Sequence, residues 1–170
     1  MKRFCLFMLA ALAFLVPRAG EAAQPDYPFQ TYEVPLYQGP VKYPDFQRRD
    51  RAFADYRTRI RDGVKQGVNF AGRYSLIQFG CGTGCSMGYV TDVSSGKVQA
   101  FPRGGDDNLY MRLQFTPKSS LVVVRWYGAD TNGPQKDRER CFEEMLVWRG
   151  GRFDRIGIKD VGDEAECWKE

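Results

Sequence analysis

The chain of 170 residues contains no histidine. This absence removes the side chain that proteins use most often as a general base and as a ligand for zinc, copper and haem. Any catalysis would have to depend on carboxylates, tyrosines, serines or thiols. We therefore expect neither a cofactor nor a bound metal ion.

Long apolar runs are also scarce, and the most apolar stretch opens the chain, from Phe4 to Val16. It is shorter than the ~18 apolar residues expected of a membrane span. Lys2 and Arg3 precede it and a segment of small residues follows, which is the layout of a secretory signal peptide. We expect residues 1–22 to be removed by cleavage after Ala22, leaving a periplasmic or secreted protein without an integral membrane anchor.

Neither sign of charge is in large excess, because 25 lysines and arginines face 21 aspartates and glutamates. Without residues 1–22 the counts are 22 and 20. This balance does not suggest a nucleic-acid partner. The 148 remaining residues are typical of one domain. We predict an extended arm over residues 23–44 and a single α+β domain over residues 45–170.

Cysteine is infrequent, and four cysteines follow the predicted signal peptide: Cys81, Cys85, Cys141 and Cys167. An even number in an exported domain favours disulfide bonds. Four cysteines allow three pairings, and the short spacing of Cys81 and Cys85 favours a local bond that leaves Cys141 for Cys167. Trp168 would then pack beside the second bond. The chain-entropy model assigns about 2 kcal/mol to the first bond and about 3.5 kcal/mol to the second.

The first cysteine pair lies in the sequence GCGTGC, residues 80–85. A disulfide across a tight turn fits this composition, because glycine reaches the backbone angles that such a ring needs. A thioredoxin-like redox site normally has two residues between its cysteines rather than three. A copper(I) site could use the soft sulfurs of Cys81, Cys85 and Met87, although Met87 is more simply a core residue. We prefer the disulfide-clamped turn.

Two patterns describe the first part of the predicted domain. Residues 23–44 contain five prolines, which lack a backbone N–H donor, so we expect an extended arm that covers the core with its aromatic side chains. Over residues 45–66 the apolar positions recur every 3.6 residues, which predicts an amphipathic helix capped by Asp45 and ended by Gly67. The apolar face of this helix consists of Phe46, Phe53, Tyr56, Ile60 and Val64. The opposite face carries arginines, with Asp45–Arg49 and Asp55–Arg59 at i,i+4 spacing.

Beyond Phe70 the chain reads as short strands separated by tight turns. The strands are expected at 74–79, 87–93, 97–101, 109–115, 121–127, 142–149 and 153–158. Such a succession predicts an antiparallel β-meander, and the length permits one sheet curled toward a half-barrel. The run LVVV at 121–124 lacks alternation, so its strand should be central and covered on both faces. The predicted fold class is α+β, with the helix packed on the sheet and disulfides stabilising both.

Four segments, NFAGRYSLIQFGCGTGC, TDVSSGKV, LQFTPKSSLVVV and VWRGGRF, carry a family resemblance. The chain resembles, over roughly residues 45–158, a group of small secreted bacterial proteins built around an NFAG-x-Y segment and a GCGxGC loop. The resemblance implies an exported single domain, and no activity is established for the group. Relatives place histidine where this chain has Arg73, which argues against a general metal or acid–base role at that position.

The clamped turn favours a non-catalytic binding module. A disulfide-strapped loop at a hairpin tip is rigid, and a preorganised loop loses less conformational entropy on docking. By analogy of form, inhibitory or immunity-type modules use such loops to bind a protein or another partner in the cell envelope. Trp126 is equally consistent with a core position. The candidate contact residues are Gly82, Thr83 and Gly84, with Arg73, Arg125, Trp126 and Tyr127 as neighbours.

An enzyme is the alternative class, and its best motif is RGGDDN at residues 103–108. Asp106 and Asp107 could serve as acid and base in a carboxylate-based hydrolase or hold a divalent cation. Adjacent carboxylates in a loop of glycine and asparagine are also ordinary turn chemistry. Because the chain has no nucleophile elbow, phosphate-binding loop or HExxH motif, we do not expect an enzyme.

Overall fold

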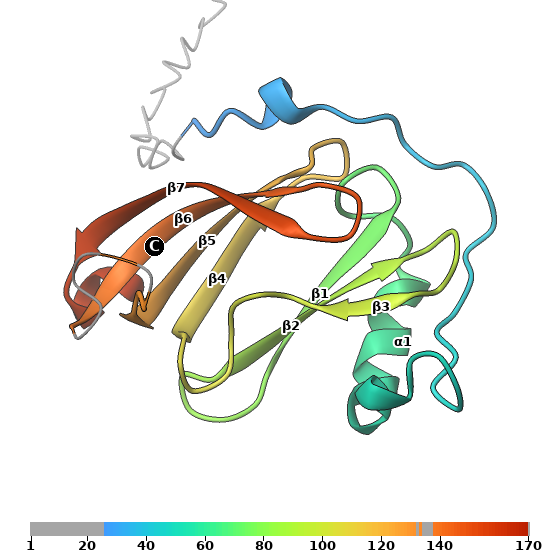
Figure 1. Ribbon diagram of the computed structural model, residues 1–170, viewed down its shortest axis with the longest axis horizontal. Helices are drawn as coiled ribbons and strands as arrows, with labels where there is room; N and C mark the ends of the chain where they lie inside the picture. The colour runs from blue at the N-terminus through green and yellow to red at the C-terminus, as the bar shows by residue number, and fades with distance from the viewer. Residues whose placement is uncertain (1–25, 132, 134–137, 170) are drawn as a thin grey trace, which may run out of the picture.

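The structure, a computed structural model, describes residues 26–131, 133 and 138–169 (Figure 1). In chain order its elements are η1 (Phe29–Tyr32), η2 (Arg51–Tyr56), α1 (Arg57–Lys65), β1 (Tyr74–Gly80), β2 (Ser86–Asp92), β3 (Val98–Ala100), β4 (Leu109–Phe115), β5 (Leu121–Ala129), β6 (Glu139–Trp148), β7 (Phe153–Gly162) and η3 (Glu164–Cys167), where η marks a 3-10 helix. The predicted signal peptide and its cleavage site lie outside the described residues. No helix in the described ranges is long and apolar enough to cross a membrane.

The strands form two antiparallel sheets, one in the order β1-β2-β3 and the other in the order β4-β5-β6-β7. Strands that follow each other in the chain pair within each sheet, as a meander requires. One continuous sheet was predicted, however, and the structure divides it at residues 101–108. Pro102 has no N–H to donate to a ladder, and Gly104 and Gly105 adopt positive φ angles of 124° and 70°. The chain therefore leaves β3 and enters β4 without pairing the two, and the curl toward a half-barrel stays a prediction.

The main core lies between the two sheets. Tyr74 and Leu76 of β1 are buried in one cluster with Val122, Val124 and Trp126 of β5. Side chains two residues apart point to the same face of a strand, so alternate positions of both strands fill this layer. The inner faces of the two sheets thus share one core.

The strand β5 is buried on both faces, as the run LVVV predicted. Its inner face belongs to the main core, and its outer face presents Leu121 and Val123 to a second cluster. The arm contributes Tyr27, Phe29 and Tyr32 to that cluster. The prediction that this strand is central is confirmed, because β5 pairs with β4 on one side and β6 on the other.

The arm over residues 26–44 is extended apart from η1 and runs along the outside of the domain (Figure 1). Three of its backbone N–H groups, those of Val34, Tyr37 and Lys42, donate hydrogen bonds to the carbonyls of Lys118, Gly72 and Val93. The Tyr27 hydroxyl donates to the Glu143 carboxylate at 2.7 Å. Burial and this hydrogen bond raise the pKa of Tyr27 to about 12. The arm is therefore fastened to both sheets by backbone and side-chain bonds.

The predicted helix over residues 45–66 is in fact divided. The α-helix α1 begins only at Arg57, and the 3-10 helix η2 precedes it. Ile60 and Val64 are fully buried against the outer face of the first sheet, as the periodic pattern predicted. The helix ends where expected, because Gly67 has a φ of 84° and donates its N–H to the Val64 carbonyl at 2.9 Å.

Asp50 explains why the first part of the segment is not α-helical. Its side chain is buried, and its carboxylate accepts hydrogen bonds from the backbone N–H of Asp45 at 2.9 Å and of Val98 at 3.1 Å. Since Val98 belongs to β3, these bonds turn Asp50 inward and fix the segment to the first sheet. Asp45 still caps the turn, because it accepts from the N–H groups of Gln47 and Arg48.

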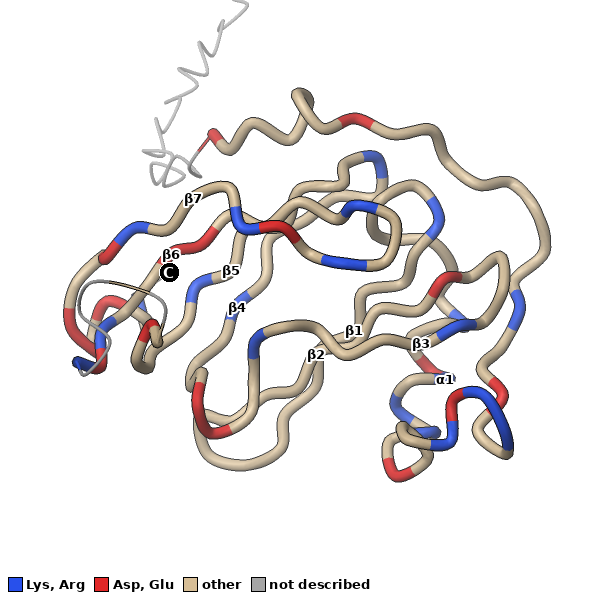
Figure 2. The backbone as a smooth tube through the Cα atoms, viewed as in Figure 1, with Lys and Arg blue, Asp and Glu red and all other residues tan. Residues whose placement is uncertain are grey.

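The basic residues gather on η2, α1 and the turn before them (Figure 2). The predicted i,i+4 ion pairs, Asp45–Arg49 and Asp55–Arg59, are absent from the described part of the chain. Arg49 instead pairs with the buried Asp50 at 2.8 Å. The guanidinium of Arg59 lies over the Phe79 ring, 5.8 Å from its centroid. The interior partner Asp50 and an aromatic ring have replaced the expected surface carboxylates.

Candidate binding surface and adjoining pocket

The GCGTGC sequence closes the hairpin of β1 and β2, and a disulfide joins Cys81 to Cys85 across it. The Cys81 N–H donates to the Cys85 carbonyl at 3.0 Å, and the Cys85 N–H donates to the Gly82 carbonyl at 3.3 Å. Thr83 is exposed at the tip. The prediction of a clamped turn is confirmed, and the two sulfurs are bonded to each other in this form.

The clamped turn rests on Tyr110 of β4. The Gly84 carbonyl accepts the Tyr110 N–H at 2.7 Å, and a Cβ atom added at Gly84 would lie 2.8 Å from the Tyr110 ring. Gly84 also has a φ of 71°, and Tyr110 itself has a φ of 54° beside an irregular register between Leu109 and Arg112. The irregularity in β4 therefore brings the aromatic ring against the turn.

The second disulfide joins Cys141 of β6 to Cys167 of η3, as predicted. It places Trp168 beside Tyr110, with ring centroids 4.7 Å apart. Arg112 donates from its guanidinium to the carbonyls of Trp168 at 2.8 Å and Lys169 at 3.1 Å. Although these contacts hold it, Trp168 remains 56% exposed. An aromatic pair, the half-buried Tyr110 and the exposed Trp168, thus lies between the two disulfides.

Carboxylates surround this aromatic pair. A hydrogen bond to Glu164 and partial burial raise the pKa of Tyr110. Partial burial and the nearby carboxylates of Glu139 and Glu164 raise the pKa of Tyr127. The carboxylates contribute to both shifts, because a nearby negative charge disfavours ionisation of a phenol.

The other predicted contact residues are dispersed. Arg73 lies at the opposite end of the β1–β2 hairpin from Thr83 and pairs with Asp92 at 3.2 Å. Arg125 lies on the outer face of β5 and pairs with Glu143 at 2.7 Å. Trp126 is 1% exposed and belongs to the main core. Of the neighbours predicted for Thr83, only Tyr127 lies at the same end of β5 as the aromatic pair, so the expected constellation is not brought together.

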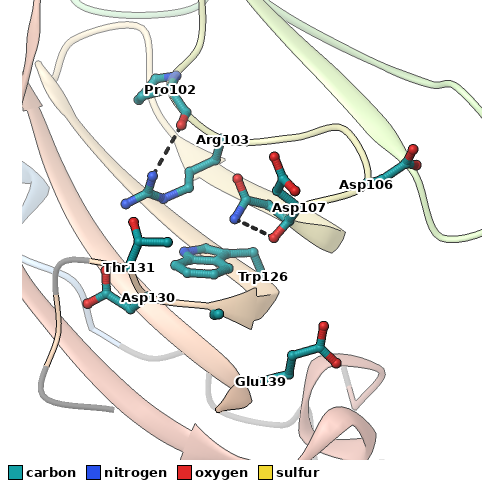
Figure 3. A pocket seen from close by; sticks show the side chains of 10 residues that line it. Pro102, Arg103, Asp106, Asp107, Trp126, Asp130, Thr131 and Glu139 are labelled. Carbon is teal, nitrogen blue, oxygen red and sulfur yellow. Dashed lines mark hydrogen bonds between the residues drawn. The ribbon is translucent and has the colours of Figure 1, made fainter. Parts of the chain in front are cut away.

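A pocket of about 410 Å³ opens beside this surface, between the loop at 102–108 and the end of β5 (Figure 3). The Trp126 indole lies in its wall, with the Arg103 guanidinium over the ring at 4.9 Å from the centroid. The predicted pair Asp106 and Asp107 also lines it. The remaining lining residues are Pro102, Asn108, Ala129, Asp130, Thr131 and Glu139.

A network of ion pairs joins two lining residues of the pocket, Arg103 and Asp130, to the buried Glu144 and to Arg155. Glu144 of β6 is fully buried, and Arg103 donates to both of its carboxylate oxygens, at 2.7 and 2.8 Å. The Trp126 indole N–H donates to the same carboxylate at 3.2 Å. Arg155 of β7 donates to Glu144 at 2.6 Å and reaches Asp130 with both Nη atoms, at 3.0 and 3.1 Å. Each buried charge is therefore compensated by a partner of opposite sign.

The described residues contain no group of three or more cysteine, aspartate or glutamate side chains that could hold a metal ion. Met87, the third sulfur of the copper hypothesis, is partly buried and packs against the cluster that contains Ile60 and Val64 of the helix. A copper(I) or dithiol function would require a reduced form of the Cys81–Cys85 pair.

Two residues of the site, Glu144 and Tyr110, were not singled out by the sequence, and the contact made by a third, Trp168, was not predicted. Glu144 lies between Phe142 and Leu146 on the same inward face of β6. A charged residue among apolar residues on a buried face was therefore the available signal. Tyr110 gave no signal, because an aromatic residue in a strand is ordinary. Trp168 was expected beside the second disulfide, but its contact with Tyr110 depends on the fold.

The described part of the chain forms a small, disulfide-bonded domain with one α-helix and two antiparallel sheets, and it carries an aromatic surface and a polar pocket. No protein-family model matches the chain, and neither the curated proteins nor the solved structures contain a match.

Proposed function

We propose that the protein is an exported, non-catalytic binding module of the periplasm, and that it binds a protein partner of the cell envelope in an inhibitory or immunity-type role. Its contact surface consists of Thr83, the flanking Gly82 and Gly84, and the aromatic pair Tyr110 and Trp168. Two disulfides are compatible with export, because such bonds persist in oxidising compartments.

The observation that carries the proposal is the exposed Trp168 held between two disulfides. Tryptophan and tyrosine are frequent anchors of protein interfaces, and an anchor that is already ordered costs less entropy on binding. Gly84 on one side and Cys167 on the other bring each disulfide next to the aromatic pair. A side chain that is 56% exposed yet fixed in this way is suited to docking.

Capture from an envelope extract tests the proposed surface. Thr83→Arg and Trp168→Ala should each abolish retention of the partner that the wild-type domain captures. Tyr43→Ala is the matched control, because Tyr43 is an exposed aromatic residue of the arm, at 48% exposure, away from the two disulfides. If Thr83→Arg leaves every captured partner unchanged, the loop is not the contact surface.

Mass spectrometry of the exported protein tests the localisation. The mature chain should begin at Ala23, and no thiol should react with an alkylating agent before reduction. A mass that retains residues 1–22, or four thiols that alkylate without reduction, would contradict export with disulfide formation.

A carboxylate-based hydrolase is the second candidate, because Asp106 and Asp107 line the pocket. The two side chains would act as acid and base on a substrate held against Trp126. Hydrolysis of an envelope polymer by the wild-type protein, lost in Asp106→Asn, would favour this function over the binding module.

A further inference from the structure

We propose that the pocket at the 102–108 loop is a binding site for an alkylammonium group, carried either by a free amine or by a lysine side chain of a peptide. The inference concerns a site separate from the aromatic surface. It does not depend on the binding module proposed above, since Thr83 and Trp168 do not line the pocket.

The pocket has the size and composition of a ligand site. Its volume of about 410 Å³ lies within the range of roughly 300–1,000 Å³ that is usual for small-molecule sites. Trp126 provides an aromatic wall, and the polar lining residues come from the 102–108 loop, the end of β5 and the start of β6 (Figure 3). Aromatic walls with a few convergent polar groups are the common arrangement of such sites.

The charges of the lining select a cation. Asp106, Asp107 and Glu139 contribute three carboxylates to the lining, beside the guanidinium of Arg103. A fourth lining carboxylate, that of Asp130, is already paired with Arg155 at 3.0 Å. The chain as a whole has a net charge of +4, so this negative region is a local feature. In Figure 2 the loop between β3 and β4 carries a red segment at its outer bend.

The buried network keeps the Arg103 cation from opposing a positive ligand. Arg103 donates two hydrogen bonds to Glu144, whose side chain is fully buried. It donates a third to the Pro102 carbonyl at 3.2 Å. The Glu144 carboxylate therefore neutralises Arg103. Asp106 and Asp107 form no ion pair within the described residues, so their charges are available to a ligand.

Arg103 also shows that this wall accommodates a cation. Its guanidinium lies over the Trp126 ring at 4.9 Å from the centroid, a cation–π arrangement, while its charge is met by a carboxylate. An incoming ammonium group would meet the carboxylates of Asp106, Asp107 and Glu139 at the open side of the pocket, next to the Arg103–Trp126 pair. The strongly hydrated ammonium prefers such partly exposed carboxylates to a dry cavity.

Nuclear magnetic resonance titration of the full-length mature protein tests the site. The probes are cadaverine and N-acetyl-lysine methylamide, and N-acetyl-norleucine methylamide is the matched probe without a charge. The Trp126 indole N–H resonance is the local reporter. Both charged probes should shift it in a saturable and salt-sensitive way, and the norleucine probe should not. Binding of cadaverine alone would identify a free amine, and binding of the lysine probe alone would identify a peptide side chain.

Matched variants separate the pocket from the overall charge. Asp106→Asn/Asp107→Asn should weaken binding of the charged probes about tenfold, because two rim charges are removed. Asp55→Asn/Asp62→Asn removes the same charge from the helical segment and should leave binding unchanged. No shift with either charged probe, or equal weakening by both double variants, would overturn the proposal. Thr83→Arg should leave probe binding intact even where it abolishes capture of the protein partner.

Discussion

Arg103 and Glu144 form a two-pronged ion pair across the inner face of the second sheet. The Nε atom donates to one carboxylate oxygen at 2.7 Å and Nη2 donates to the other at 2.8 Å, and the two residues are 41 positions apart in the chain. The pair fastens the loop between the two sheets to β6. Since this loop forms one wall of the pocket, the buried carboxylate determines where that wall stands.

Removal of the Glu144 charge should destabilise the protein strongly. Glu144→Gln would leave the guanidinium groups of Arg103 and Arg155 without their shared carboxylate in a buried position. Breaking a buried ion pair from one side typically costs about 3–5 kcal/mol. Urea unfolding followed by circular dichroism should show this loss in the free energy of unfolding.

The exposed pair of Arg149 and Asp154 serves as the control for that experiment. The Arg149 side chain is 58% exposed and its Nε atom lies 3.2 Å from an Asp154 oxygen. Arg149→Gln should cost no more than about 1 kcal/mol, because water screens such pairs. A loss in Glu144→Gln as small as the loss in Arg149→Gln would show that the buried network does not hold the loop.

Asp50 should make stability depend on acid pH. Burial alone would raise the pKa of its carboxyl, but hydrogen bonds from Arg49 and from the N–H groups of Val98 and Asp45 outweigh burial and lower the pKa below 3.8. A carboxyl whose pKa is lower in the folded state stabilises the protein above its unfolded pKa. This contribution should be complete above about pH 4 and should disappear as the pH falls through the folded pKa.

The variant Asp50→Asn tests that contribution. At pH 7 it should lose about 1–3 kcal/mol, because the charged acceptor is replaced by an amide that cannot serve all three donors. Its unfolding midpoint in urea should vary less than that of the wild type between pH 5 and pH 2. Asp55→Asn, at an exposed position of η2, should retain the wild-type pH profile. An unchanged profile in Asp50→Asn would refute the assignment.

Asp50 also shows where prediction from sequence ends. Alternating apolar residues predicted the strands, and the unbroken run at 121–124 predicted the doubly covered one, because burial of side chains follows the period of the strand. Asp50 gave no comparable signal, since its partner Val98 is 48 residues away. A buried acceptor of that kind interrupts a helix that local periodicity predicts.

The division into two sheets has a similar explanation. A segment with proline and glycines at 102–105 is typical of a turn, whether it returns the chain to the same sheet or carries it to another.

The same limit applies to the site. Asp106 and Asp107 were recognised as a motif, but their position in one pocket with Trp126 depends on how the sheets pack. Local spacing did suffice for both disulfides, because Cys81 and Cys85 are close enough to pair first.

The two disulfides should differ in their effect on stability. Their ring sizes follow from sequence separations of 4 and 26 residues. The chain-entropy model therefore predicts losses of about 2 kcal/mol for Cys81→Ser/Cys85→Ser and about 3.5 kcal/mol for Cys141→Ser/Cys167→Ser. Urea unfolding of both double variants measures the difference. Equal losses, or no loss in the second variant, would mean that the bonds do not act as constraints on the unfolded chain.

Substitution of Gly84 should expose the link between the clamped turn and the aromatic pair. Gly84 has a φ of 71°, and a Cβ atom there would lie 2.8 Å from the Tyr110 ring. Gly150 has a similar φ of 59° but no atom within 4 Å of the added Cβ. Both Gly→Ala variants should therefore incur backbone strain of about 1 kcal/mol, and only Gly84→Ala should displace the ring.

The difference between these two variants isolates the contact with Tyr110. Gly84→Ala should lose about 1–3 kcal/mol more than Gly150→Ala, the usual cost of overpacking a contact. Because the Tyr110 ring lies against Trp168, with centroids 4.7 Å apart, the fluorescence of Trp168 should also change in Gly84→Ala alone. A variant lacking Trp168 should not show the change. Equal stability and identical fluorescence in the two variants would mean that the turn does not order the aromatic pair, and the preorganised surface would lose its physical basis.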